Sequence, residues 1–518
     1  MRIAFRSQIE AIDARAVAER RPDCDLIERA GTLLAKAVSE EAQKVVRRDV
    51  ILFCGPGKNG ADGYRAALAL KNAGYETLCV APGGEARSRE ASYAASLYLA
   101  SGGRIVSQVP EETVKNAGLL VDALFGTGLS RPVEGAFALA VGEINRAGRP
   151  VIAADLPTGI EADSGRILGN AVRAHRTVTF TLPKPAHFLA HGPVGELTVA
   201  DLGIPEEIVS SAGPFPTAFG DREAAALLPP RPDDTHKGHY GKAVLFAGGF
   251  SYSGAASLAA RAAVRSGAGL VWACVPRAAY PAVAAAAHEA ITFPLEEYPD
   301  GSIAYPALRD PRLQKIVSGA DAFAAGSGLI PGPGAKRLLK LLLATRKKLV
   351  LDAGMLHFLS AGHSFGEEAH ILFEDKPLHE NVILTPHRGE LMRIFGKDPA
   401  REGESPLSLA SRIAKSSGAV IVLKGHRTVV AAPDGRVALN TTGNPGMARG
   451  GSGDVLAGTV AGLAARMDAF DAAALGVFLN GRAGDLCRAR LGETGMTPEN
   501  VIDSLGEAAR SAGKGSSL

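Results

Sequence analysis

A glycine-rich segment near the end of the chain, residues 444–456, offers the clearest chemistry in the sequence. It reads NPGMARGGSGDVL and leads into an Ala- and Leu-rich stretch that predicts a helix over residues 455–466. The first amides of a helix have no partner within it, and the helix dipole adds partial positive charge at the same end. Gly450, Gly451 and Gly453 allow the backbone to approach a ligand without a Cβ in the way. The segment therefore predicts an anion site, and phosphate is an anion that such loops bind.

Asp454 follows these glycines and needs a separate explanation. A carboxylate beside a phosphate site repels the ligand, so a catalytic role explains Asp454 better than a role in binding. It can take the proton of a hydroxyl group that attacks a phosphoryl group. The alternative is that Asp454 only caps the helix, as aspartate often does. A cap explains the aspartate but not the three glycines before it, so we favour the catalytic base.

Length and composition limit the classes of protein to consider. The 518 residues predict two or three domains. With 21% charged and 46% hydrophobic residues and a net charge of +3, the chain is neither disordered nor marked as nucleic-acid-binding. The five cysteines are scattered and form no C-x-x-C pair, which argues against disulfides and structural zinc. No apolar run has the length of a signal peptide core or a membrane span, so we expect a cytoplasmic protein.

The elements that must position these residues follow a repeated order. After predicted helices over 6–19 and 26–47, short apolar runs alternate with Ala-rich segments, which predicts a mostly parallel sheet with helices on both faces. Ligands bind at the carboxyl ends of such strands, where GPGKNGADG, FGTGLSRP and DLPTG lie. The Pro-rich passage 211–234 predicts a boundary near Gly220, after which the alternation begins again. We therefore predict an α/β protein of two domains.

Loops in both halves resemble known families. GPGKNGADG, VDALFGTGL and DLPTGI resemble the YjeF N-terminal family of NAD(P)H-hydrate epimerases, which implies a Rossmann-like α/β/α sandwich over residues 1–220. The segments KGHYGKAVLFAGG, SGAASLAARAAVRSGAGLV, TPHRGE, VLKGHRT and NPGMARGGSGDVLAG resemble the ADP/ATP-dependent NAD(P)H-hydrate dehydratases, which implies a ribokinase-like α/β/α domain over residues 221–518. The resemblance covers nearly the whole chain, in the order of the fused bacterial repair enzymes.

The resemblance implies an enzyme that repairs hydrated nicotinamide cofactors. Its substrates would be NADHX and NADPHX, in which water has added across a double bond of the nicotinamide ring to give two epimers. The first half would interconvert the epimers, and the second would dehydrate the S epimer with ADP, giving NAD(P)H, AMP and phosphate. We expect these small molecules as partners together with a homo-oligomer, and neither a nucleic acid nor a membrane.

In the first half, the resemblance carries over to three groups of residues. A loop that contacts the dinucleotide would consist of Lys58, Asn59, Gly60, Ala61 and Asp62. A second loop would wrap its phosphates with backbone amides, and its residues are Gly126, Thr127, Gly128, Leu129, Ser130, Arg131 and Pro132. Asn59, Asp122 and Thr158 match potassium ligands, and their oxygens are hard donors that suit this cation. Asp155 matches a substrate-binding position and is our candidate for acid–base catalysis.

Simpler explanations exist for each acid in the first half. Asp62 and Asp122 could be turn or cap residues, and Asp155 a turn former at a strand end. Three acids at successive strand ends of one sheet instead favour a shared crevice. The chain also departs from the family, which usually has Asn at Lys58 and Gly at Ala61. A lysine beside phosphates leads to the hypothesis that the phosphorylated cofactor is preferred.

In the second half, the resemblance makes Asp454 the base and the amides of residues 450–453 the holder of the moving phosphoryl group. The stretch that cradles AMP would be Lys424, Gly425, His426, Arg427 and Thr428, with Gly453 as a further contact. Positions lining the hydrated nicotinamide nucleotide would be Ala255, Gly328 and His387. Glu390 would help to place the Mg²⁺ that accompanies ADP.

Alternatives remain open in the second half as well. Lys424 could be a solvated lysine at a strand end, and His387 a loop histidine without a ligand. The family commonly reads DADAL where this chain reads DAGML, so an acidic residue is missing at Gly354. A ribokinase-type kinase for a small molecule would use the same Asp454, although it has no need of the first half. A nucleotide-binding protein with one inactive half is compatible with the departures at Ala61 and Gly354.

Overall fold

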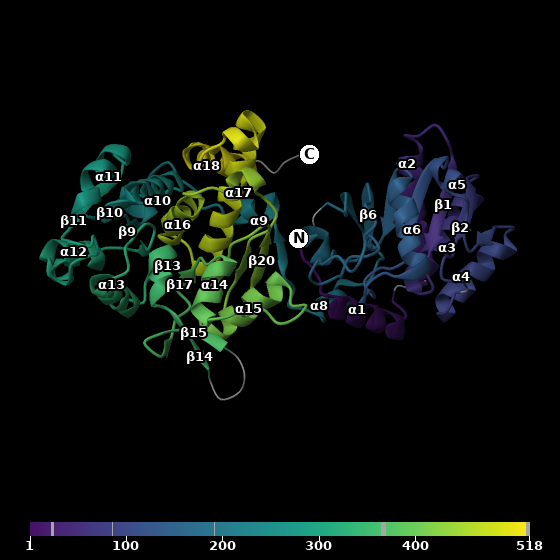
Figure 1. Cartoon of the computed structure of the whole chain (residues 1–518), viewed down its shortest axis with the longest axis horizontal. Coiled ribbons are helices and arrows are strands. Elements are labelled where there is room, and N and C mark those ends of the chain that lie inside the picture. Colours follow the sequence, from purple (N-terminus) through teal and green to yellow (C-terminus); the bar gives the residue numbers. More distant parts are fainter. Residues whose placement is uncertain (22–24, 85, 191, 364–368, 514–518) are drawn as a thin grey trace. The chain divides into compact units, whose positions relative to one another are not determined.

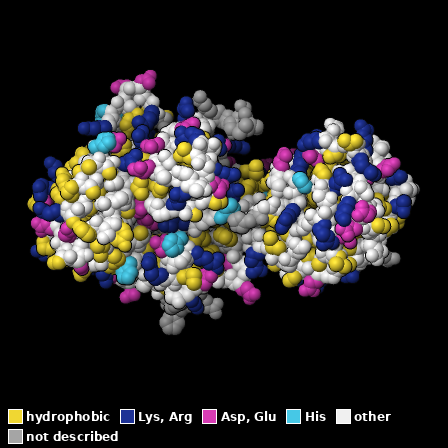
Figure 2. Space-filling view, turned by 45° about the horizontal axis from the view of Figure 1, so that its top comes forward, with side chains coloured by type: hydrophobic (Ala, Val, Ile, Leu, Met, Phe, Trp, Pro, Cys, Tyr) yellow, Lys and Arg dark blue, Asp and Glu magenta, His cyan; other side chains and the backbone are white. Residues whose placement is uncertain are grey.

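The computed structural model describes residues 1–21, 25–84, 86–190, 192–363 and 369–513 (Figure 1). Contacts divide the chain into two compact units, one of residues 2–215 and one of residues 216–518 with Met1. The division lies inside the Pro-rich passage 211–234. On the face in Figure 2, acidic and basic side chains of the described residues are interspersed over both units. Among the described residues, no helix is long and apolar enough to cross a membrane.

The first unit contains one parallel sheet in the order β3-β2-β1-β4-β5-β6-β7. Its elements in chain order are α1 (Arg6–Glu19), α2 (Leu26–Ala42), β1 (Asp49–Cys54), α3 (Lys58–Asn72), β2 (Glu76–Val80), α4 (Arg89–Ala100), β3 (Ile105–Val106), α5 (Glu111–Lys115), β4 (Leu119–Ala123), α6 (Gly135–Arg146), β5 (Val151–Ala154), β6 (Arg176–Phe180), α7 (Ala186–Leu189), β7 (Glu196–Ala200) and α8 (Glu206–Ser210). The strand order reverses between β1 and β4, and such a switch point is where open α/β sheets bind ligands.

Both faces of this sheet are covered, which explains why its strands are apolar throughout. Along β1, Leu52 faces a core shared with helices α2, α3 and α4, whereas Ile51 and Phe53 face a second core shared with α6. The layered α/β architecture predicted for this half is confirmed.

The second unit has a larger sheet in the order β11-β10-β9-β12-β13-β17-β18-β19-β20-β8, and a small antiparallel sheet β14-β15-β16. Its strands are β8 (Thr217–Phe219), β9 (Lys242–Phe246), β10 (Leu270–Pro276), β11 (Ile291–Leu295), β12 (Ala322–Ala325), β13 (Lys348–Leu351), β14 (Ser360–His363), β15 (Ala369–Phe373), β16 (Lys376–Pro377), β17 (Val382–Leu384), β18 (Val420–Leu423), β19 (Val429–Ala431) and β20 (Val437–Asn440). From β11 to β18 the large sheet is parallel, and β19 and β20 form the antiparallel hairpin predicted around Pro433-Asp434-Gly435.

Helices cover this second sheet and confirm the α/β class of the unit. The α-helices are α9 (Asp221–Leu227), α10 (Ser253–Arg265), α11 (Tyr280–Ala286), α12 (Pro311–Ser318), α13 (Pro333–Ala344), α14 (Arg388–Phe395), α15 (Pro406–Ser417), α16 (Ser452–Ala464), α17 (Ala469–Gly495) and α18 (Pro498–Gly513). Short 3-10 turns are η1 (Lys237–Tyr240), η2 (Arg277–Ala279), η3 (Tyr305–Arg309), η4 (Ala353–Phe358) and η5 (Pro445–Met447). Residues of α10, α16, α17 and α18 share one apolar core with the strands.

Two helices differ from their predicted bounds. Helix α2 ends at Ala42 rather than near Arg47, because the β-branched Val46 that follows is fully exposed and has no apolar face to bury. Helix α16 begins at Ser452 rather than Val455. Gly451, with a φ of 95°, turns the chain sharply enough for the next residue to be helical. Asp454 is therefore the third residue of the helix and not its N-cap.

Helices α10 and α16 approach so closely that a glycine is needed between them. A Cβ added at Gly458 would lie 2.1 Å from the carbonyl oxygen of Ala259. We expect Gly458→Ala to lower the urea midpoint of the full chain, because overpacking costs about 1–3 kcal/mol. Gly506→Ala in α18 is the matched control, since a Cβ there meets nothing within 4 Å. It should keep or raise the midpoint, and equal losses in the two variants would contradict the packing argument.

Candidate active sites

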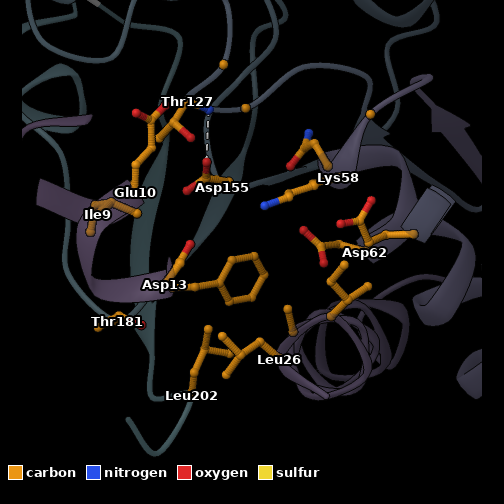
Figure 3. A pocket seen from close by; sticks show the side chains of 18 of the residues that line it. Ile9, Glu10, Asp13, Leu26, Lys58, Asp62, Thr127, Asp155, Thr181 and Leu202 are labelled. Atoms are coloured by element: carbon orange, nitrogen blue, oxygen red, sulfur yellow. Dashed lines mark hydrogen bonds between the residues drawn. The ribbon is translucent and has the colours of Figure 1, made fainter. Parts of the chain in front are cut away.

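A cavity of about 1240 Å³ opens in the first unit at the carboxyl ends of its central strands (Figure 3). Its walls come from α1, the start of α2, the start of α3, the loop after β4 and the residues that follow β5 and β6. The predicted residues that line it are Lys58, Asn59, Asp62, Gly126, Thr127, Gly128, Leu129 and Asp155. A cavity of this size suits a ligand as large as a dinucleotide.

Asp155 is held by several contacts at the end of β5. Its Oδ1 accepts hydrogen bonds from Lys184 Nζ at 2.7 Å and Thr179 Oγ1 at 3.0 Å, and its Oδ2 accepts one from the amide of Thr127 at 3.0 Å. Burial alone would raise the pKa of Asp155, but the Lys184 ammonium and these bonds outweigh it and lower that pKa below its usual range. Asp155 also has a φ of 63°, a strained conformation for a non-glycine residue that is common at active sites.

Residues 58–62 occupy the first turn of helix α3, which corrects the loop that we predicted there. Asp62 accordingly lies on a helix and not at a strand end. The amides of Lys58, Asn59 and Gly60 precede the first intrahelical bond, which Ala61 donates to Gly57 at 3.2 Å. The carbonyl of Gly55 would lie 1.9 Å from a Cβ at Gly60, so only glycine fits at this position.

The loop after β4 offers amides to the same cavity. Thr127 uses its amide on Asp155, and Leu129 donates to Gly126 at 3.3 Å. Among the described residues, nothing accepts a hydrogen bond from the amides of Gly126, Gly128, Ser130 or Arg131. Free amides on a glycine loop are what a phosphate group requires.

The three predicted potassium ligands lie beneath this loop. Asp122 Oδ1 accepts a hydrogen bond from Thr158 Oγ1 at 2.7 Å, and its Oδ2 accepts one from the Thr158 amide at 2.7 Å. Burial raises the pKa of Asp122 to about 6 despite these bonds. Among the described residues no cationic side chain pairs with it. A fully buried carboxylate with neutral partners only, beside the hydroxyl of Thr158, is a donor set that fits a monovalent cation.

Two residues of this cavity were missed from the sequence. Lys184 is buried, with a side chain only 2% exposed, and lies four residues after the end of β6, whereas Asp155 directly follows β5. Its position at a strand end was a usable signal. Asp13 lies in the middle of α1, where nothing in the local pattern distinguishes it from a surface aspartate. Ala61 is buried in α3 and does not line the cavity.

The second unit gathers its candidate residues at the carboxyl ends of β12, β13, β17 and β18. Asp352 follows β13 and accepts hydrogen bonds from Thr385 Oγ1 at 2.7 Å and Lys424 Nζ at 2.9 Å. Lys424 Nζ also lies 3.6 Å from Glu390 Oε2. Burial lowers the pKa of Lys424, but the carboxylates of Asp352 and Glu390 outweigh it and raise that pKa overall. Lys424 is thus a paired cation inside the site and not a solvated surface lysine.

Asp454 lies at the start of α16, close to this network. Burial and the negative charge of Asp352 raise the pKa of Asp454 to about 6, while a hydrogen bond with Ser327 and the charge of Lys424 oppose the shift. A Cβ at Gly453 would lie 3.6 Å from Lys424 Nζ. Among the described residues, nothing accepts a hydrogen bond from the amides of Gly450, Gly451, Gly453 or Asp454. The arrangement places free amides, a cation and a base side by side.

The other predicted residues of this half lie around that centre. Gly328 has a φ of 70°, and a Cβ there would lie 2.9 Å from the Cβ of Ala255, so these two residues are neighbours. His387 caps α14 by accepting a hydrogen bond from the Glu390 amide at 3.2 Å. A backbone bridge joins His387 to Lys424.

The structure also describes the predicted AMP-binding stretch, residues 424–428, and the surroundings of Gly354. In the stretch 424–428, Arg427 has a φ of 58° and donates to the carbonyl of Thr441, while the Gly425 amide donates to Thr428 Oγ1 at 3.4 Å. A Cβ at Gly354 would lie 2.3 Å from the carbonyl oxygen of Leu329. The backbone here leaves no room for the acidic side chain that the resemblance led us to expect.

Both halves of the chain match known protein families. Residues 23–186 match the family model of the YjeF-related protein N-terminus, and residues 243–506 match that of NAD(P)H-hydrate dehydratase. The chain is 38% identical over 502 residues to the bifunctional NAD(P)H-hydrate repair enzyme Nnr of Moorella thermoacetica, covering 93% of this chain and 92% of that protein. The chain belongs to the family of bifunctional NAD(P)H-hydrate repair enzymes. The bifunctional NAD(P)H-hydrate repair enzyme Nnr of Thermofilum pendens is 34% identical to this chain over 526 residues, and the match covers 98% of this chain and 96% of that protein.

A solved structure also resembles the second unit. It is the ADP/ATP-dependent NAD(P)H-hydrate dehydratase from Bacillus subtilis co-crystallised with ATP and Mg²⁺, which is 30% identical and has a TM-score of 0.48. The match covers 57% of this chain and 98% of that chain.

The buried pair of Lys184 and Asp155 gives a prediction about stability. Lys184→Met leaves a buried carboxylate without its cation, which we expect to lower the free energy of unfolding by about 3–5 kcal/mol. The measurement is urea denaturation of the full chain. The control is the double variant Lys184→Met with Asp155→Asn, which removes both charges and should recover most of the loss. A double variant as unstable as the single one would show that the ion pair is not the cause.

Proposed function

We propose that this chain is a bifunctional repair enzyme in which residues 1–220 interconvert the epimers of NADHX and NADPHX and residues 221–518 dehydrate the S epimer with ADP. The observation that carries the proposal is the match to bifunctional repair enzymes over more than nine-tenths of the chain. The two candidate sites support the proposal. The first half has a cavity large enough for a dinucleotide, and the second half has free amides and a lysine beside Asp454. Placing both activities on one chain allows both epimers of the damaged cofactor to be rescued.

In the first half, the substrate would enter the cavity with its phosphates against the free amides of Gly126 and Gly128, in the predicted loop 126–132, and those at the start of α3. Lys58, which lines the cavity and is exposed, would add positive charge near them. Asp155 would act on the hydrated ring, and Lys184 would hold it ionised. A potassium ion held by Asn59, Asp122 and Thr158 would supply positive charge beneath the phosphate loop.

In the second half, the hydroxyl oxygen of the substrate would attack the terminal phosphorus of ADP while Asp454 takes the hydroxyl proton. The bond from that phosphorus to AMP breaks, and AMP leaves. The ring nitrogen then uses its lone pair to expel phosphate, and loss of a proton from the next carbon gives NAD(P)H. The free amides at Gly450, Gly451 and Gly453 would stabilise the charge on the phosphoryl group.

Residues 424–428 would hold the AMP part of the nucleotide, and Ala255, Gly328 and His387 the hydrated nicotinamide nucleotide. Mg²⁺ would enter with the phosphates of ADP and neutralise part of their charge. Among the described residues no cluster of three metal-ligating side chains exists, and Lys424 already pairs with Asp352 and Glu390. Asp352 and Glu390 are the carboxylates that would lie beside the phosphates, and Mg²⁺ bound with a nucleotide typically takes few protein carboxylates and keeps several waters.

The test is an assay with mixed epimers of NADHX, ADP and Mg²⁺ that follows the return of NADH absorbance. The full chain should convert all of the substrate, and Asp454→Asn should lower the dehydration rate by about 10²–10⁴-fold.

The raised pKa of Asp454, about 6, predicts how the rate of dehydration depends on pH. The base must be ionised, so wild-type kcat/KM should fall as the pH drops below about 6, and a rate independent of pH there would exclude Asp454. If no NADH is formed and the chain instead transfers phosphate from ATP to another small molecule, the result would support a kinase.

The potassium proposal has its own test. Asp122→Asn removes the only carboxylate of the predicted site, so it should abolish stimulation of epimerisation by K⁺ and leave dehydration of pure S epimer unchanged. The measurement is the rate of conversion of R to S epimer in buffers of K⁺ and of tetramethylammonium at equal ionic strength. Equal rates in both buffers for the wild-type chain would exclude a role for K⁺.

A further inference from the structure

The carboxyl group of Asp62 has no partner in the protein, although it lies in the cavity of the first unit. Asp62 is only 9% exposed. Among the described residues, no side chain or amide forms a hydrogen bond or ion pair with its carboxyl group. Figure 3 shows that this group points into the space that Lys58 also enters. Buried polar groups are almost always hydrogen-bonded, so an unpartnered carboxyl aimed into a cavity indicates a group that meets a ligand.

Asp62 and Asp155 face the same cavity in opposite electrostatic situations. Asp155 accepts hydrogen bonds on both oxygens and is paired with Lys184, so it is ionised. Burial raises the pKa of Asp62 well above its usual range, and the carboxylates of Asp155 and Asp13 add to the effect. The surroundings thus favour the protonated form of Asp62 and the ionised form of Asp155. Two acids kept in different protonation states are the arrangement that acid–base catalysis requires.

The reaction proposed for this half needs such a pair. The two epimers differ only at the ring carbon that carries the hydroxyl group, which is bonded to the ring nitrogen. One route that changes the hand is loss of the hydroxyl from one face of the ring and return of water on the other. Departure requires a proton donor on the first face, and addition requires a proton acceptor on the second.

We propose that Asp62 is the general acid of epimerisation and that Asp155 is the base on the opposite face of the ring, an inference that rests on the function proposed above. Asp62 donates its proton to the hydroxyl oxygen, the carbon–oxygen bond breaks, water departs, and the nitrogen lone pair forms a C=N⁺ bond. Water then adds to the other face of that carbon and gives a proton to Asp155, which restores the neutral ring nitrogen. Asp62 ends ionised and Asp155 protonated, which is the state needed for the reverse reaction, and proton exchange with solvent resets the pair.

The charged groups around Asp62 come from several elements and determine its titration. They are Asp13 of α1, Asp25 before α2, Lys58 of α3, Asp155 after β5 and, through its pair with Asp155, Lys184 after β6. Glu10, Arg20 and Glu90 also line the cavity, so acidic side chains outnumber basic ones around Asp62. This excess of negative charge adds to burial in raising the pKa of Asp62 and favours its protonated form.

The experiment compares wild type with Asp62→Asn, which keeps the shape of the side chain but has no acidic proton. Epimerisation of R-NADHX is followed by chromatography over a range of pH. We expect kcat to fall by about 10²–10⁴-fold with KM little changed. We also expect the variant to lose the decrease in rate that the wild type shows at high pH, and Asp62→Glu to recover part of the activity. Glu19→Gln is the matched control, because Glu19 is an exposed carboxylate of α1 that is paired with Arg15 and does not line the cavity.

Each outcome has a distinct meaning. A urea unfolding curve of Asp62→Asn that matches that of the wild type shows that the first unit of the variant is folded, which dehydration of pure S epimer by the separate second unit would not show. If KM rises while kcat and the pH profile stay as in the wild type, Asp62 only binds substrate and the inference is wrong. If the wild-type chain itself does not convert R to S epimer, the function proposed for the first half fails, and the inference fails with it.

Discussion

The candidate chemistry of both halves depends on one constraint of parallel sheets. Every strand of a parallel sheet ends at the same edge, and the helix that follows begins there with free amides and a partial positive charge. In the first unit this edge brings Asp155, Lys184 and the start of α3 to one cavity, although they are far apart in sequence. In the second it brings Asp352, Lys424 and the start of α16 together. Convergence of distant residues is thus a consequence of topology.

Each site contains a buried or half-buried lysine that pairs with one or two of its carboxylates. Lys184 holds one carboxylate ionised, whereas Lys424 lies between Asp352 and Glu390. Asp62, Asp122 and Asp454 have raised pKa values because burial outweighs the favourable charges and hydrogen bonds near them. The same order of strands and helices therefore supplies carboxylates whose pKa is lowered beside a lysine and carboxylates whose pKa is raised by burial.

The sequence predicted most of the fold and the centre of each candidate site, because both depend on local patterns. Alternating apolar runs identify strands, and glycines before a helix identify an anion site, so Asp454 could be singled out from the local pattern. Asp155 was chosen because it matches a substrate-binding position of the family that the first half resembles. Asp13 could not be singled out, since a helix position becomes part of a cavity only through tertiary packing. Tertiary packing also explains why glycine stands at position 354 where the resemblance predicted an acidic residue, because the carbonyl group of Leu329 lies too close for a side chain. The start of α3 was read as a loop because glycines favour both descriptions.

The short strand β8 has a consequence for any attempt to separate the two halves. Residues 217–219 pair in parallel with β20 at the margin of the large sheet, through Ala438↔Thr217 and Asn440↔Phe219. A protein that starts at residue 221 would lose this strand and expose the unpaired backbone of β20, a template for association between molecules. Starting before Pro216 would retain the strand. The connecting passage between the halves is in this respect an integral part of the second one.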